Sequence, residues 1–230
     1  MPVIYQLKFA NGFQDRNKDN QISNRIKDSS FCCILAIDSN IFSNLNYMEK
    51  LTIDENQFLE KLNLAHAETI FNAIDQNRKF LRKWLPFVDF TIRVADTEKF
   101  VRSILEKPLS IRDEVYVIWY KHEFAGLIGF KDADRINDKI EIGYWLTEKM
   151  TGKGVATAAT RKMVNLAFRN MEMNRIQIRC GIGNDKSAAI PRRLGFSFEG
   201  IERAGERHNH EYIDLEVFSI LKREWAETLF

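Results

Sequence analysis

The chain has 230 residues and a hydrophobic content of 45%, which suffices to bury the core of one domain, or of one domain with an appendage. Its 34 basic and 32 acidic residues are interspersed and leave a formal charge of only +2, which argues against a nucleic-acid-binding surface. No apolar run reaches the roughly 18 residues of a membrane helix, and the N-terminus shows no secretory signal, so we expect a soluble protein of the cytoplasm with no membrane partner.

Residues 1–47 differ in character from the rest of the chain. The stretch 11–30 is crowded with Asn, Asp, Lys, Arg and Ser and has no hydrophobic period, which is typical of a poorly ordered segment. Regular patterning begins near Met48. We therefore expect a loosely attached N-terminal extension over residues 1–47 and one domain over residues 48–230, and one hypothesis is that Met48 is the true start.

The first half of this domain is predicted to contain a strand, three helices and a hairpin. Apolar residues at helical spacing indicate the helices, and Pro86 ends the second of them. The predicted elements are a strand over residues 56–64, two consecutive helices within 65–85, a helix capped by Asp96 or Thr97 that runs to about 106, and hairpin strands over 114–120 and 124–130.

The second half contains the most regular pattern of the chain. Residues 139–146 alternate as a strand does, a glycine loop follows, and apolar residues then recur at helical spacing to about residue 171. The remaining predictions are a strand over 175–180, a short helix over 187–194 that Asn184 can cap, and strands over 196–200 and 211–221. The class is α+β, with a mostly antiparallel sheet, flanking helices and one central strand-helix-strand crossover.

The three cysteines do not form a disulfide framework. Cys32 and Cys33 are adjacent and poorly placed to bridge each other, while Cys180 ends an alternating apolar run and is expected to be a small core residue. The two histidines of His208-Asn209-His210 have no third ligand nearby in the sequence, which favours a hairpin tip over a metal site. We expect no bound metal.

The glycine loop has a chemical meaning because it opens a helix. The first turn of a helix leaves backbone N–H groups unpaired, and the helix dipole makes that end electropositive. Gly152 and Gly154 remove side chains that would keep an anion away, and Lys153 adds a positive charge. A phosphate or pyrophosphate is therefore the expected ligand, although the two glycines alone could also serve a tight turn.

Further segments carry a family resemblance. The loop Thr151-Gly152-Lys153-Gly154-Val155-Ala156 follows the strand Glu141-Ile142-Gly143-Tyr144-Trp145-Leu146, and Asn184-Asp185-Lys186-Ser187 precedes Leu194-Gly195-Phe196, with Trp84-Leu85-Pro86 upstream. In this the chain resembles the GCN5-related N-acetyltransferase (GNAT) superfamily, and within it the RimJ/RimL type that acetylates the N-termini of ribosomal proteins. The resemblance covers residues 48–225 and implies a three-layer α/β sandwich.

The resemblance implies an acetyl-CoA-dependent acyltransferase with acetyl-CoA as donor and no metal. The family loop begins with Gln or Arg, whereas this chain has Thr151, which affects a side-chain contact but not the backbone amides. The central strand is expected to splay from the next one to admit the pantetheine arm. The residues implied to bind the donor are Trp145, Leu146, Thr151, Gly152, Lys153, Gly154, Val155, Ala156, Thr157 and Asn184.

Amine attack on a thioester needs a neutral amine and a proton for the departing thiolate. The resemblance assigns Ser187 to the thiolate sulfur, and its alternative is an ordinary first-turn serine. Glu141 and Glu206 are the candidate general bases. For Glu141, an ordinary solvated carboxylate on a strand is an equally good interpretation. Trp84 and Phe87 are expected to wall the acceptor side, with core packing as their rival.

The preferred function is acetylation of a protein N-terminal α-amine, such as that of a ribosomal protein. One alternative is acetylation of a small amine, either a polyamine or an aminoglycoside. Another is an acetyl-CoA-binding sensor that has lost its chemistry. The expected partners are acetyl-CoA and the amine acceptor, without nucleic acid, and a homodimer is kept open.

Overall fold

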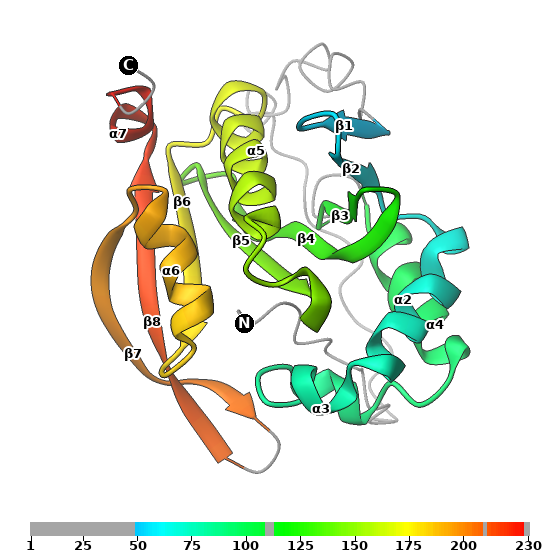
Figure 1. Cartoon of the computed structure of the whole chain (residues 1–230). Helices are drawn as coiled ribbons and strands as arrows, with labels where there is room; N and C mark the ends of the chain where they lie inside the picture. Colours follow the sequence, from blue (N-terminus) through cyan, green and yellow to red (C-terminus); the bar gives the residue numbers. More distant parts are fainter. Residues whose placement is uncertain (1–48, 109–112, 209–210, 228–230) are drawn as a thin grey trace, which may run out of the picture. The chain divides into compact units, whose positions relative to one another are not determined.

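The computed structural model describes residues 49–108, 113–208 and 211–227 (Figure 1). The predictions made for residues 1–47, for Met48 and for Cys32 and Cys33 lie outside the described residues. Of the segment His208-Asn209-His210, the structure describes His208 alone.

The described strands form one eight-stranded sheet in the order β1-β2-β3-β4-β5-β6-β8-β7. All neighbouring pairs run antiparallel except β5 and β6, which run parallel and are joined by helix α5 (Figure 1). The predicted α+β class, with a mostly antiparallel sheet and one central crossover, is confirmed. The strands are β1 (Lys50–Thr52), β2 (Gln57–Lys61), β3 (Val115–Tyr120), β4 (Glu123–Asp134), β5 (Lys139–Leu146), β6 (Arg175–Gly181), β7 (Ser197–His208) and β8 (Glu211–Leu221).

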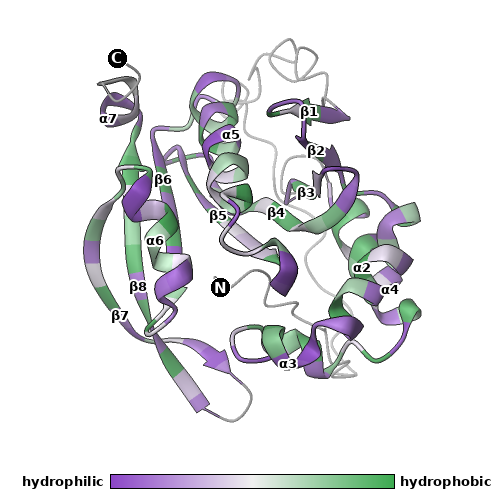
Figure 2. Ribbon diagram, in the orientation of Figure 1, coloured by the Kyte–Doolittle hydropathy of each residue, from purple (hydrophilic) through white to green (hydrophobic). Residues whose placement is uncertain are grey.

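Helices cover both faces of this sheet. Their hydrophobic and hydrophilic residues are interspersed, as Figure 2 shows for α2 and α4, and the apolar ones are buried against the strands. The α-helices are α2 (Ala67–Gln76), α3 (Arg78–Leu81), α4 (Val94–Leu105), α5 (Val155–Arg169), α6 (Asp185–Arg193) and α7 (Lys222–Glu227); the 3-10 helices are η1 (Leu64–His66), η2 (Pro86–Asp89) and η4 (Glu148–Met150).

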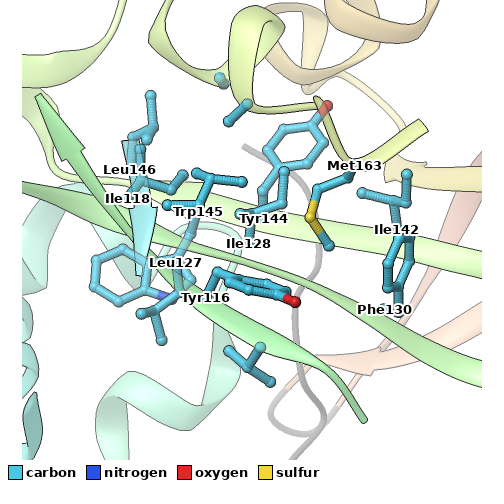
Figure 3. Packing of buried hydrophobic residues seen from close by; sticks show 14 of the residues in the cluster. Tyr116, Ile118, Leu127, Ile128, Phe130, Ile142, Tyr144, Trp145, Leu146 and Met163 are labelled. Carbon is cyan, nitrogen blue, oxygen red and sulfur yellow. The ribbon is translucent and has the colours of Figure 1, made fainter. Parts of the chain in front are cut away.

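Tyr144 and Trp145 of β5 mark the two faces. Consecutive side chains of a strand point to opposite sides of the sheet, and Figure 3 shows these two rings leaving the strand in opposite directions. Trp145 lies beside Ile70 of α2 and Phe100 of α4, whereas Tyr144 lines a cavity together with residues of α5 and α6. The structure therefore has three layers, with α2 and α4 on one face and α5 and α6 on the other.

Helix α4 begins at Val94, earlier than predicted. The carboxylate of Asp96 accepts hydrogen bonds from the backbone N–H groups of Ile92 (2.9 Å) and Arg93 (3.0 Å), so it satisfies the helix start from within the first turn. The prediction that Asp96 or Thr97 is the cap was wrong, because Arg93 holds that position.

Strand β7 is longer than predicted. It was expected to end at Gly200 but continues to His208, with two irregularities in its pairing with β8. Gly200 and Ala204 have positive φ angles of 139° and 51° at these irregularities, and the interruptions hide the alternation that would have predicted the strand. This extension carries Glu206. Strand β1 and helix α7 were not predicted at all.

No helix among residues 49–108, 113–208 and 211–227 combines the length and the apolar character that crossing a bilayer requires.

Candidate active site

The glycine loop between β5 and α5 has the geometry of an anion site. Gly154 is the N-cap of α5 with a φ of 78°, and no side chain caps the helix. The first-turn amides of Val155, Ala156 and Thr157 are therefore left without a capping side chain. A Cβ atom built on Gly152 or Gly154 would meet nothing within 4 Å, so the space in front of the loop is open.

Thr151 contributes to the loop rather than to the anion. Its hydroxyl donates a 2.8 Å hydrogen bond to the carbonyl of Glu148, one turn earlier. Lys153 is exposed and does not line the adjacent cavity. Of the predicted donor residues in the loop, Thr151, Gly152, Gly154, Val155, Ala156 and Thr157 line that cavity.

The cavity has a volume of about 790 Å³ and runs between α5, α6 and the end of β5. The glycine loop forms one part of its lining, and Ser187 of α6 forms another. A cavity of this size is within the range of cofactor-binding clefts. It therefore connects the predicted anion site with the residue predicted to meet the sulfur.

Strands β5 and β6 pair along only part of their length. Lys139, Ile140 and Glu141 pair with Arg175, Ile176 and Gln177, and the remaining residues of β5 have no partner on β6. The sheet is thus open at the carboxyl end of β5. This is where Tyr144 and Leu146 line the cavity.

Trp145 and Leu146 present their amides to different neighbours. The N–H of Thr147 donates to the carbonyl of Ala125 on β4, at 2.9 Å. The backbone N–H groups of successive strand residues point to alternate neighbouring strands. The N–H of Trp145 therefore also faces β4, and that of Leu146 faces the opening toward β6. Leu146 is therefore the one placed to donate a hydrogen bond into the opening.

Ser187 is buried on the first turn of α6, where three contacts fix it. Its Oγ lies 3.0 Å from the Sγ of Cys180, its carbonyl accepts a 3.4 Å hydrogen bond from the hydroxyl of Tyr144, and its N–H donates to the carbonyl of Asn184. Burial raises the pKa of Cys180 to about 12, and burial also raises the pKa of Tyr144 well above its ordinary value. Both groups stay protonated at neutral pH. Cys180 lies in the core, as predicted.

Asn184 is buried but does not cap α6 with its side chain. Asn184 is the N-cap residue of α6, as predicted, although its side chain makes no capping hydrogen bond. Its Nδ2 is buried and has no hydrogen-bond partner among the described residues. A buried amide donor without a partner is costly, which favours a ligand at this position.

Glu141 points to the face opposite Tyr144 and is engaged by cations. Its Oε1 lies 2.8 Å from the Nζ of Lys131, and its Oε2 accepts hydrogen bonds from Arg179 (2.7 Å) and Gln177 (3.0 Å). Arg179 also pairs with Glu202 at 3.1 Å. Because both carboxylate oxygens of Glu141 are occupied, the arrangement favours a role in holding these cations.

Glu206 lies on β7 near the same cations but is held differently. It is 4% exposed, and neither carboxylate oxygen has a hydrogen-bond partner among the described residues. Burial is the main cause that raises the pKa of Glu206 to about 7; the charges of Lys131 and Arg179 oppose this rise and the charge of Glu141 adds to it. A carboxylate with free oxygens and a pKa near neutrality fits a general base.

Pairing across β6, β8 and β7 places Glu206 on the face opposite α6. Gly181 of β6 pairs with Leu215 of β8, and Glu206 of β7 pairs with Ile213 of β8. Ile213 and Leu215 are two residues apart on one strand, so their side chains point to the same face, and the residues paired with them share that face. Cys180 points the other way, toward Ser187. Ser187 and Glu206 therefore lie on opposite faces of the sheet, near the opening between β5 and β6.

Trp84 and Phe87 are placed differently from each other. A Cβ atom on Gly181 would lie 3.3 Å from the Trp84 ring and 3.2 Å from Ile213, so Trp84 covers the face that carries Glu206. Phe87 is buried beside Trp145 in a small cavity against α2 and α4. The positions agree with an acceptor wall for Trp84 and with core packing for Phe87.

Some residues of the cavity lining were not among the predicted site residues. Ala158 and Arg161 on α5, and Lys186 and Arg193 on α6, also line the cavity. Ala158 and Arg161 lie four and seven residues after Gly154, which was the available signal on α5, whereas Lys186 and Arg193 have no such spacing from Ser187. No group of three or more His, Cys, Asp or Glu side chains within the described segments could hold a metal.

Comparisons with known proteins agree with this geometry. A family model described as an acetyltransferase (GNAT) domain matches residues 57–197. The chain is 36% identical over 175 residues to "Putative ribosomal N-acetyltransferase YdaF" of Bacillus subtilis (strain 168), an alignment that covers 75% of this chain and 95% of that protein. It is 26% identical over 171 residues to the ribosomal-protein-serine acetyltransferase of Escherichia coli (strain K12), covering 74% of this chain and 96% of that protein.

A solved structure shares the fold. It is a microcin self-immunity acetyltransferase in complex with acetyl-CoA and AMP, 27% identical, with a TM-score of 0.69 over 74% of this chain and 94% of that chain.

Proposed function

Because this chain belongs to the GNAT acetyltransferase family, we propose that it transfers the acetyl group of acetyl-CoA to the N-terminal α-amine of a protein, with a ribosomal protein as acceptor. The two curated relatives support this acceptor, since both are named for ribosomal acetylation. The observation that carries the proposal is the opening between β5 and β6, which has the donor cavity with Ser187 on one face and Glu206 on the other.

The chain offers one backbone or side-chain group for each part of donor binding. The first-turn amides of α5 would hold the pyrophosphate, and the partnerless Nδ2 of Asn184 would donate to a carbonyl of the pantetheine arm. When bound, acetyl-CoA supplies the thioester that is attacked. The N–H of Leu146 faces the opening and would donate to the thioester oxygen as negative charge develops there.

Glu206 is the residue that we assign to the proton of the attacking amine. Its oxygens have no hydrogen-bond partner among the residues that the structure describes, and at pH values above about 7 the group is a carboxylate and can accept a proton. Glu141 is assigned instead to holding Lys131 and Arg179 beside Glu206. The two carboxylates thus have separate tasks.

Ser187 is assigned to the departing sulfur. Ser187 lines the donor cavity, and its hydroxyl would donate a hydrogen bond to a thiolate that develops there. Cys180 and Tyr144 keep their protons at neutral pH, so they hold Ser187 in place without adding negative charge beside the leaving group. The amine proton then passes to Glu206, and the hydroxyl of Ser187 stabilises the departing thiolate with a hydrogen bond until solvent protonates the sulfur.

The acceptor proposal follows from the ordinary pKa values of amines. At pH 7 roughly one in ten α-amines is neutral, whereas only one in a few thousand lysine side chains is, from typical pKa values of about 7.8 and about 10.4. A site with one base whose pKa is about 7 gains most from the acceptor that is more often neutral. We therefore assign the α-amine over the lysine side chain.

Residues 48–230 make up the proposed acetyltransferase domain, with residues 1–47 as an extension. A ribosomal-protein acceptor places the proposed enzyme in the cytoplasm, and assembly as a homodimer stays an expectation.

Thiol release from acetyl-CoA, measured with a ribosomal-protein fraction, with spermidine or with no acceptor, tests the proposal. We expect release with the protein fraction, and mass spectrometry should then find a gain of one acetyl group at an N-terminus. Release with spermidine alone would favour a small-amine acetyltransferase. Binding of acetyl-CoA without release under any condition would favour a sensor.

A further inference from the structure

Arg179 of β6 contacts carboxylates on three other strands. Its Nε donates a 2.7 Å hydrogen bond to Oε2 of Glu141 on β5, and its Nη1 donates a 3.1 Å hydrogen bond to Oε2 of Glu202 on β7. Its Nη2 also lies 3.8 Å from the exposed carboxylate of Asp132 on β4. The guanidinium presents its donors in a rigid fork, so it can bond two carboxylates in different directions at once. One side chain therefore connects the strands on the two sides of the opening.

This connection lies where the backbone pairing between β5 and β6 stops. Glu141 and Gln177 form the last pair, and beyond it the structure describes no pairing between these two strands. Arg179 is two residues past Gln177, and both side chains bond Glu141, so they share one face of β6. The bond between Arg179 and Glu141 is thus a side-chain link across the start of the opening.

Lys131 holds Glu141 in a different way. The two residues are directly paired on β4 and β5, and the Nζ of Lys131 lies 2.8 Å from Oε1 of Glu141. Side chains at directly opposite positions of an antiparallel pair are neighbours because of the backbone ladder itself. The contact of Lys131 therefore stays within one side of the opening, whereas the contacts of Arg179 reach both sides.

The other end of the connection leads to Glu206. The pairing of β7 with β8 is irregular between Glu202 and Glu206, where Ala204 has a φ of 51°, so the backbone ladder is interrupted just before Glu206. A Cβ atom built on Gly205 would lie 3.0 Å from the Cγ and Cδ atoms of Glu202. The Glu202 side chain thus packs against the residue that precedes Glu206. A bond that holds Glu202 also holds the backbone that carries Glu206.

Arg179 acts on Glu206 through its charge as well. Burial raises the pKa of Glu206, and the positive charges of Lys131 and Arg179 oppose this rise. The charged or titratable groups on the elements around Glu206 are Lys131 and Asp132 of β4, Glu141 of β5, Arg179 of β6, Glu202 and His208 of β7, Glu211 of β8, and Lys83 beside Trp84. Arg179 combines its charge with the contact to β7.

We propose that Arg179 is a positioning residue for the general base: it links Glu141 to Glu202 across the opening, and in this way it fixes Glu206 on the acceptor face and favours its carboxylate form. The inference rests on the proposed function, because it takes Glu206 as the base. A lysine at this position would keep the positive charge but would replace the fork by a single ammonium group, and a glutamine would lose the charge too. The two substitutions therefore separate geometry from charge.

The test measures kcat and kcat/KM against pH for the full chain, with acetyl-CoA and a peptide that has a free N-terminus. We expect Arg179→Lys to lower kcat by about tenfold or more, because a small displacement of a catalytic group is costly, and to leave the pH profile and the KM for acetyl-CoA in place. Arg179→Gln should lose as much and should also move the fall toward low pH to higher pH, because loss of the positive charge raises the pKa of Glu206.

Arg175→Lys is the matched control. Arg175 lies on the same strand and bonds Glu199 of β7 at 2.6 Å, but its charge is not among those that shift the pKa of Glu206. This variant should keep both the natural kcat and the natural pH profile. Urea unfolding of each variant at pH 8 confirms that the compared chains are folded.

Glu202→Gln weakens the same link from its other end. It should lower kcat as Arg179→Lys does, and the double variant Arg179→Lys/Glu202→Gln should lose no more than either single variant, because the second change has no link left to break. Losses that multiply in the double variant would show that the two residues act separately, which overturns the proposed link.

The outcomes separate this inference from the proposed function. If Glu206→Gln loses its part of the fall toward low pH while Arg179→Lys and Glu202→Gln keep the natural kcat, as Arg175→Lys does, the positioning role is overturned and the base assignment stands. If Glu206→Gln leaves the profile and the rate unchanged, both are overturned. If Arg179→Gln does not fold, Arg179→Lys and Glu202→Gln decide, because each keeps a polar side chain of similar length.

Discussion

The Sγ of Cys180 lies 3.0 Å from the Oγ of Ser187, at the point where the donor cavity meets the opening between β5 and β6. Burial raises the pKa of this thiol to about 12, so at neutral pH it is a neutral hydrogen-bonding partner. The contact fixes the Ser187 hydroxyl without charge. Its effect on catalysis should therefore be visible in the step that releases the sulfur.

Replacing Ser187 with Ala should lower kcat more than it raises the KM for acetyl-CoA. The hydroxyl is assigned to the transition state, where the sulfur gains negative charge, and such a loss affects kcat and kcat/KM together. We expect a decrease of about 10- to 100-fold, from the usual contribution of a hydrogen bond to a charged group. Ser103→Ala is the matched control, because the hydroxyl of Ser103 donates to the carbonyl of Phe100 in its own helix, α4. An unchanged rate of the chemical step would reduce Ser187 to a structural residue.

Replacing Glu206 with Gln should remove, from the pH profile of kcat/KM, the fall toward low pH that comes from protonation of Glu206. Below pH 7 the kcat/KM of the natural chain should fall with the protonation of both Glu206, whose pKa is about 7, and the free α-amine, whose pKa is about 7.8. A logarithmic plot then has a slope near two for the natural chain and near one for Glu206→Gln, whose rate at pH 8 should be lower by roughly 10² or more.

Glu141→Gln provides the comparison for this profile. It makes the same change from carboxylate to amide but should keep this fall, displaced to lower pH, because the charge of Glu141 raises the pKa of Glu206. If Glu141→Gln lost this fall of kcat/KM toward low pH and Glu206→Gln kept it, Glu141 would be the general base and Glu206 would not.

Glu206→Gln should also be more stable than the natural chain, to an extent that depends on pH. Below the ordinary carboxyl value of 4.5, Glu206 is protonated in both the folded and the unfolded chain. Between 4.5 and about 7 the unfolded chain releases this proton while the folded chain retains it, so the natural fold loses stability as pH rises. The full difference is on the order of 3 kcal/mol. Urea unfolding of both chains at pH 4.5 and pH 8 measures it, and a pH-independent difference contradicts the buried, partnerless placement.

Replacing Gly154 with Val should weaken CoA binding by tenfold or more. The φ of 78° strains any L side chain, and the added atoms would fill the open space in front of the first-turn amides. Gly195→Val is the control, because Gly195 has a φ of 79° and lies outside the cavity lining. Both variants should lose stability. Equal CoA affinities in the two variants would move the anion site elsewhere.

The sequence predicted the elements that have strong local signals. Residues 139–146 alternate up to Tyr144 and form β5 over the predicted range, and the glycine loop opens α5 as expected. Long-range pairing was harder to predict. The short β1 is stabilised by its pairing with β2, and the extended β7 by its pairing with β8 across two irregularities, so neither has a clear pattern of its own.

In the candidate site too, the residues with local sequence signals were predicted and the long-range contacts were not. The loop and Ser187 are contiguous motifs, and the structure brings both to one cavity. The different environments of Glu141 and Glu206 depend on Lys131 and Arg179, which come from β4 and β6, and no spacing in the sequence gives those contacts. Arg161 and Arg193 meet at the cavity because α5 and α6 pack together, which again is a tertiary fact.

The central claim is acetylation of an N-terminal α-amine, and a competition between two peptides tests it most directly. One peptide has a free N-terminus and no lysine, and the other has a blocked N-terminus and one lysine, with otherwise equal sequences that begin like a ribosomal protein. Acetyl transfer from acetyl-CoA is followed by mass spectrometry at pH 7, where the α-amine is the far more abundant neutral nucleophile. The account predicts faster acetylation of the peptide with the free N-terminus; faster acetylation of the lysine peptide contradicts it.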